Sequence, residues 1–293
     1  MKRLLSIARA TAQEVLSEPL QLLLTAFSLA LAVVAPALHY HQFGEPSRMA
    51  REAGLSALLV GGLLYAVFGT VKTIRRELET GTAQMALAHS VSRAAFFFGK
   101  LLGVGAALAV FFMTVAAAYL TAVRGAELGA IFAEAHGYVP KTDRTLLAFS
   151  LAPLFLAPVA AAALNRFYRF RFVPTAALLA LVSAVPGVFV SPDFKLYSRL
   201  ALAAIPVYAP LVAFLAISGA AALRFKDHLA VSISLVCATL ALPFFGNYYL
   251  ADALSKGGSI NTAYILAALA GAVPIALAAF LAGVLSFTDR DVV

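Results

Sequence analysis

Residues that could do chemistry are few in this chain, and the best-spaced pair is His39 and His41. Two imidazoles separated by one residue could share a metal ion if the segment were extended. No third or fourth ligand stands near them in the sequence, so we interpret both as interfacial histidines. A stretch of the form GxxxxGK[ST] is also missing, which excludes a phosphate-binding Walker A loop in this chain.

Ionisable residues suited to acid–base catalysis are also few. The chain has 14 Asp and Glu, and none of them lies well inside an apolar run; the same holds for Lys and Arg. An ion-coupled secondary transporter usually keeps an ionisable group within its helix bundle. An intramembrane enzyme likewise needs a polar site that we could not assemble. We therefore expect no catalytic residue, no metal and no cofactor in this chain.

Most of the chain consists of apolar segments suited to the interior of a lipid bilayer. Of 293 residues, 62% are hydrophobic and 12% are charged, and the mean hydropathy is +0.91. That much apolar surface predicts an integral membrane protein. The apolar runs match the roughly 20 residues of a helical span, so the expected fold is an all-α polytopic bundle forming one domain, 1–293. The runs are Gln21–Leu38, Leu55–Val71, Phe96–Val123, Leu146–Leu164, Val173–Val190, Ala201–Leu223, Leu229–Phe245 and Tyr264–Phe287.

Eight apolar segments, or six core spans plus two re-entrant pieces, bring both termini to the same side. With both termini inside, the inner segments hold 14 of the 22 Lys and Arg, the bias expected of cytoplasmic loops. The net charge of +8 follows from this bias, which favours a lipid bilayer with anionic headgroups as the partner and not nucleic acid. We therefore predict a multi-pass protein of the cytoplasmic membrane, with Glu127 in an outside loop. The inner residues are Lys2, Arg3, Arg9, Lys72, Arg75, Arg76, Arg93, Lys100, Arg166, Arg169, Arg171, Arg224, Lys226 and Arg290.

Residues 1–19 are predicted to form an interfacial helix ahead of the first span. The apolar side chains recur at helical spacing while the polar ones fall elsewhere on the wheel, and Pro19 ends the pattern. The alternative is a solvated extension of the first span. The apolar set is Leu4, Leu5, Ala8, Ala12, Val15 and Leu16, and the polar set is Arg3, Arg9, Gln13 and Glu14.

A polar segment from Arg75 to Lys100 separates two long apolar runs. Within it Gly81 can reverse the chain as at the end of a short helix, and Ser92 is placed to cap the next one. We predict a short amphipathic helix parallel to the membrane, with a solvated connector as the alternative. Gly99 and Gly103 have the GxxxG spacing of a close helix contact, which we expect to be with another span.

Several features of this segment occur in a fixed order: Glu77, Gly81-Thr82, the aliphatic Met85 to Leu87, Val91-Ser92-Arg93, Phe96 to Phe98, and Gly99-Lys100. Together with the N-terminal helix, they make roughly residues 1–120 resemble the permease subunits of type 2 ABC exporters. Ser90 stands where that family usually has proline. The second half of the chain matches only as hydrophobic spans.

The resemblance implies a transmembrane permease subunit that forms the substrate pathway and works with a separate cytoplasmic ATPase, which would bind the ATP and Mg. A second permease, identical or related, would complete the transporter. Segment 74–95 would be the coupling segment. A non-transporting membrane anchor or assembly scaffold is the alternative, ahead of an ion-coupled transporter or intramembrane enzyme. The residues implied in ATPase contact are Glu77, Gly81, Thr82, Met85, Leu87, Ser92, Arg93 and Lys100.

Overall fold

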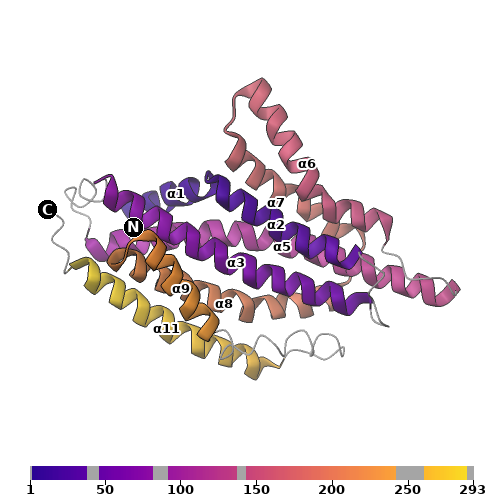
Figure 1. The fold of residues 1–293 in the computed structure, drawn as a ribbon. Helices are drawn as coiled ribbons and strands as arrows, with labels where there is room; N and C mark the ends of the chain where they lie inside the picture. The colour runs from indigo at the N-terminus through magenta and orange to yellow at the C-terminus, as the bar shows by residue number, and fades with distance from the viewer. Residues whose placement is uncertain (1, 38–45, 82–91, 137–142, 242–260, 289–293) are drawn as a thin grey trace.

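The computed structural model describes residues 2–37, 46–81, 92–136, 143–241 and 261–288. This part of the chain is helical, with no strand (Figure 1). The helices are α1 (Lys2–Leu16), α2 (Pro19–Ala37), α3 (Pro46–Glu79), α5 (Arg93–His136), α6 (Arg144–Tyr168), α7 (Phe172–Val190), α8 (Phe194–Arg224), α9 (Asp227–Ala241) and α11 (Thr262–Thr288). The predicted all-α class and multi-pass character are confirmed at this level.

Within the described residues, six helices are long and apolar enough to cross a bilayer: α3, α5, α6, α7, α8 and α11. A seventh span results if α1 and α2, which are bent by 66° at their junction, are counted as one. The eight apolar segments of the sequence therefore do not all become full-length spans in the described residues. The described helix α9 has 15 residues, or about 22 Å, which is short of a hydrocarbon core of about 30 Å.

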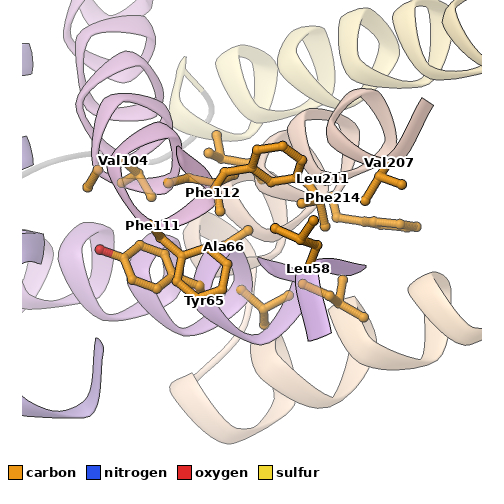
Figure 2. Close-up of a cluster of buried hydrophobic side chains, with 14 of the residues drawn as sticks. Leu58, Tyr65, Ala66, Val104, Phe111, Phe112, Val207, Leu211 and Phe214 are labelled. Carbon is orange, nitrogen blue, oxygen red and sulfur yellow. The ribbon is translucent and has the colours of Figure 1, made fainter. Parts of the chain in front are cut away.

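The core of the bundle is built where α3, α5 and α8 meet (Figure 2). The Tyr65 and Phe111 rings lie 4.8 Å apart between centroids, and Phe112 meets Tyr208 edge-on at 5.1 Å. In a bilayer, helices associate through close packing because lipid tails are as apolar as the side chains. Interlocking of large rings with small residues thus holds these helices together. The labelled members are Leu58, Tyr65, Ala66, Val104, Phe111, Phe112, Val207, Leu211 and Phe214.

Helix α1 is amphipathic as predicted and packs along the beginning of α5. A Cβ atom added at Gly103 would lie 2.5 Å from the Ala8 carbonyl oxygen, and one at Gly99 would lie 3.0 Å from Ile7. Glycine is therefore what allows the two helix backbones to approach. The expected GxxxG contact is present, but its neighbour is α1 and not another full-length span. Buried Thr11 shares the inward face with Ala8.

Contacts between helices identify the two ends of the bundle. At the end where α3 finishes and α5 begins, a small cavity is lined by residues of α3, α5, α8 and α11, including Leu78, Phe96, Leu223 and Phe287. We call this the α3–α5 end. At the opposite end, Arg51 near the start of α3 meets Glu127 of α5. The hairpin of α6 and α7 projects from the side of the bundle (Figure 1).

Candidate functional site

The predicted coupling segment begins and ends with the local structures that its sequence suggests. Gly81 has a φ of 70°, a left-handed conformation that glycine adopts without steric cost. The Ser92 hydroxyl accepts a hydrogen bond from the Ala95 amide at 3.2 Å, which confirms Ser92 as an N-cap. Gly81, however, follows the long helix α3 and not a short separate helix. Residues 74–79 continue α3, and residues 93–95 already belong to α5.

The centre of this segment lies outside the described residues. Thr82, Met85 and Leu87 fall there, so the predicted amphipathic helix parallel to the membrane is not among the described elements. His39 and His41 lie outside them as well. Within the described residues, no group of three or more His, Cys, Asp or Glu side chains could hold a metal ion.

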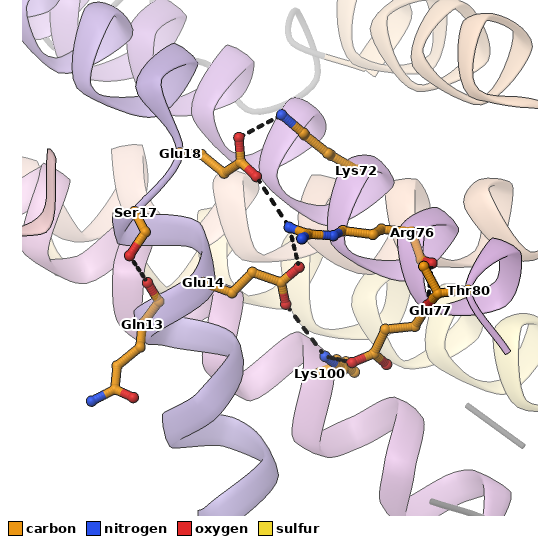
Figure 3. Close-up of polar contacts among 9 residues, drawn as sticks. All are labelled: Gln13, Glu14, Ser17, Glu18, Lys72, Arg76, Glu77, Thr80 and Lys100. Atoms are coloured by element: carbon orange, nitrogen blue, oxygen red, sulfur yellow. Dashed lines mark hydrogen bonds and ion pairs between the residues drawn. The ribbon is translucent and has the colours of Figure 1, made fainter. Parts of the chain in front are cut away.

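The described site residues converge on a buried lysine. Lys100, about two turns into α5, is 4% exposed and forms an ion pair with Glu77 of α3 (Figure 3). Its ammonium group also lies 3.8 Å from the Glu14 carboxylate of α1. Burial raises the pKa of Glu14, while nearby Lys100 acts in the opposite direction. One cation therefore joins three helices, and sequence reasoning missed that an ionisable group would be buried here.

A second set of charges extends this network to the junction of α1 and α2. Glu18 forms an ion pair with Lys72, and Arg76 lies 3.7 Å from Glu18 and 3.5 Å from Glu14 (Figure 3). We call the six residues Glu14, Glu18, Lys72, Arg76, Glu77 and Lys100 the charge cluster. Glu18 lies between Lys72 and Arg76, and Glu14 lies between Arg76 and Lys100. Glu77 pairs with Lys100 at the end of this series.

A signal for this cluster was present in the sequence. Glu14 and Glu18 are four residues apart, and so are Lys72 and Arg76. Residues at this spacing share one face of a helix, so one helix presents two acids and another two bases. Nothing local, however, indicates that these two faces meet.

Two further contacts tie other helices to the same end. Arg75 of α3 donates from Nε to Asp227 at the start of α9, at 2.8 Å, and pairs with Glu79 at 3.0 Å. Arg93 donates from Nη1 to the Phe287 carbonyl oxygen, near the end of α11, at 3.2 Å. A cation at a helix C-terminus satisfies a carbonyl group that has no partner within the helix.

Some of the predicted contact residues are buried inside the protein, and others are exposed on its surface. Lys100 is buried, and Glu77 faces it from α3. Ser92 and Thr80 are exposed beside them. A cavity of about 610 Å³ adjoins the cluster, lined by Glu14, Glu18, Arg76, Glu77 and Arg171 among others. The carboxylates of Glu14, Glu18 and Glu77 in this lining are ion-paired with Lys72, Arg76 and Lys100.

The opposite end carries a smaller charge network that the sequence analysis misplaced. Glu127 was expected in an outside loop, but α5 continues to His136 and places it in a helix. Its carboxylate lies 2.9 Å from Arg51 and 3.6 Å from Arg124. Arg124 also lies 3.3 Å from Asp193, just before α8. These partners neutralise the charges that α5 carries just past its apolar run.

An apolar cavity of about 420 Å³ lies between α5, α8 and α11. Its walls include Phe112, Tyr208 and Leu269, and the Tyr208 hydroxyl donates to the Gly105 carbonyl oxygen at 3.4 Å. This cavity suits hydrocarbon better than a polar solute.

No family model, curated protein or solved structure matches this chain.

Proposed function

We propose that this chain is the permease subunit of an ATP-driven ABC exporter, coupled to a separate cytoplasmic ATPase. Two lines of reasoning support the proposal: the ordered features of residues 77–100 that resemble the type 2 family, and the charge cluster beside them. The charge cluster is the stronger support, because it connects the helices on either side of the coupling segment to other helices.

Segment 82–91 joins the end of α3 to the start of α5, so a force on it acts on both helices. Through Glu77 and Lys100 those helices are paired with each other, and through Glu14 with α1. Arg75 and Arg93 extend the connection to α9 and α11. An ATPase seated on the segment would therefore move several helices as one body, which is the class of rigid-body switching.

In this proposal the partner ATPase binds ATP and Mg, and this chain binds neither. A second permease, identical or related, completes the pathway. Gly81, Thr82, Met85, Leu87 and Ser92 supply the contact surface. Glu77, Arg93 and Lys100 act behind it by holding the helices together. The membrane is the cytoplasmic membrane, with the α3–α5 end inside.

Site-specific crosslinking tests the proposal. Cys237 is the only cysteine, so Cys237→Ala gives a cysteine-free background into which Thr80→Cys is introduced. Tagged chain is purified from native membranes with a bifunctional crosslinker. We expect a crosslink to a protein whose Mg-dependent ATP hydrolysis is retained in the eluate. Thr145→Cys, exposed at the start of α6 near the opposite end, is the matched control and should give no such crosslink.

Two outcomes would contradict the permease assignment. If no ATP hydrolysis accompanies the purified chain, the anchor or scaffold alternative moves ahead. If the hydrolysing protein crosslinks equally from Thr145, contact with it is not specific to the α3–α5 end.

A further inference from the structure

The turn between α6 and α7 alternates basic and aromatic residues. Residues 166–172 read Arg-Phe-Tyr-Arg-Phe-Arg-Phe. Neither the charge cluster nor the coupling segment accounts for this pattern. It lies at the tip of the hairpin that projects from the bundle (Figure 1).

The backbone of this turn is held in one conformation. Arg169 has a φ of 58°, which is uncommon for a residue other than glycine. Its amide donates to the Asn165 carbonyl oxygen at 3.0 Å, and the Asn165 side chain donates to the Phe170 carbonyl oxygen. The Thr175 hydroxyl donates to the Arg171 carbonyl oxygen at 2.7 Å. The side chains between are therefore displayed from a defined loop.

The aromatic rings of the turn are not packed into the bundle. Phe167 is 78% exposed, Tyr168 is 71% exposed and Phe170 is 55% exposed. The Tyr168 and Phe170 rings pair with each other at 6.4 Å between centroids. Such large exposed aromatic surface is typical of residues at the level of lipid headgroups, where amphipathic rings are favoured.

The three arginines of the turn differ from the basic side chains of the charge cluster. Arg166, Arg169 and Arg171 are exposed, and none of them makes an ion pair within the described residues. Arg171 lines the same cavity as the acidic residues Glu14 and Glu18. Those two carboxylates are already paired with Lys72, Arg76 and Lys100. The turn thus presents uncompensated positive charge.

We propose that this turn is a binding surface for anionic phospholipid headgroups. Arg166, Arg169 and Arg171 receive headgroup phosphates, to which a guanidinium can donate two parallel hydrogen bonds. The exposed rings enter the interfacial layer around them. Charge complementarity favours an anionic leaflet over a zwitterionic one, and the rings favour a membrane surface over a free anion in water. The site tethers the hairpin to the leaflet surface beside the charge cluster.

The chain contains no tryptophan, so Tyr168→Trp places a single fluorescent reporter in the turn. The full-length variant is prepared in detergent micelles and titrated with brominated phosphatidylglycerol or with brominated phosphatidylcholine of the same acyl chains. We expect quenching at lower concentrations of phosphatidylglycerol, and a loss of that preference at high salt.

Arg166→Gln combined with Arg171→Gln, on the reporter background, tests the charge. Arginine near an anionic surface strengthens association by about fivefold per residue, so the midpoint for phosphatidylglycerol should rise about 25-fold. Arg169 is left unchanged because of its backbone conformation. Arg224→Gln with Lys226→Gln, exposed between α8 and α9 at the same end, is the matched control and should leave the midpoint within about twofold.

Four results, the last used only if the double variant does not fold, would overturn the proposal. Equal quenching by both lipids would show that the rings enter any interface without headgroup recognition. An equal effect of the control pair would show general attraction and no site. Protection of the reporter from both lipids when an ATPase is bound would assign the turn to a protein contact. If the double variant does not fold, the salt dependence of the reporter chain alone decides, and a salt-independent midpoint refutes the assignment.

Discussion

Lys100→Met removes the cation at the centre of the charge cluster while keeping a flexible side chain of similar length. Lys100 is 4% exposed, so its partner Glu77 would lose a buried counter-charge. Glu14, at 3.8 Å, would lose an attraction of about 4 kcal/mol in gross Coulomb energy at an effective dielectric constant of 20. Breaking a buried ion pair by removing one partner costs about 3 to 5 kcal/mol. We take about 3 kcal/mol, because Glu77 keeps partial contact with water.

The measurement is thermal stability of the full chain in detergent, followed by size-exclusion chromatography after heating. A loss of about 3 kcal/mol corresponds to a fall in melting temperature of about 6 to 12 °C for a domain of this size. Lys72→Met is the matched control, since Lys72 also pairs with one glutamate but its side chain is 53% exposed. An exposed pair contributes about 0 to 1 kcal/mol, so its melting temperature should fall by no more than about 4 °C.

A double variant separates the buried charge from lost packing. Glu77→Gln in the Lys100→Met background removes the negative charge that Lys100 had neutralised, so it should recover part of the lost stability. Equal shifts for Lys100→Met and Lys72→Met would refute the reasoning, because burial would then have no bearing on the energetics. A further loss in the double variant would show that Glu77 is stabilised by something other than Lys100.

Three other outcomes follow from the geometry. Gly103→Val should displace α1 from α5, and limited proteolysis should then show new cleavage after Arg3 or Arg9. Gly105→Ala is the control and should leave the cleavage pattern unchanged, because a Cβ atom at Gly105 would lie 3.9 Å from its nearest neighbour. Glu127→Lys should lower the melting temperature by at least about 6 °C, since it places a third cation beside Arg51 and Arg124. Glu134→Lys, exposed on the same helix, is its control. Similar shifts for the two variants would show that the partly buried ion pairs of Glu127 do not affect stability. Thr80→Cys in intact cells should react only with membrane-permeant reagents, and labelling from outside would reverse the proposed orientation.

Local features of the coupling segment could be predicted from the sequence because their causes are local. Ser92 caps α5 through an amide three residues away, and Gly81 adopts the left-handed conformation that a side chain would resist. The amphipathic pattern of residues 2–16 likewise predicts α1, since the pattern lies within one helix. What the sequence could not predict at this level was how far α3 and α5 extend past their apolar runs. Both extensions carry charges that residues distant in the sequence neutralise, and such partners leave no local pattern.

Composition and run length alone determined that this chain is a helical membrane protein, because an apolar stretch in a bilayer must satisfy its own backbone hydrogen bonds. The GxxxG spacing likewise indicated a close contact without naming the partner. Only the tertiary structure decided that α1 fills that contact and that Lys100 meets Glu14, 86 positions earlier in the chain. Glu14 and Lys100 each look like ordinary surface charges in sequence. Their pairing depends on the packing of α1 against α5, and packing between distant helices is set by shape and not by local pattern.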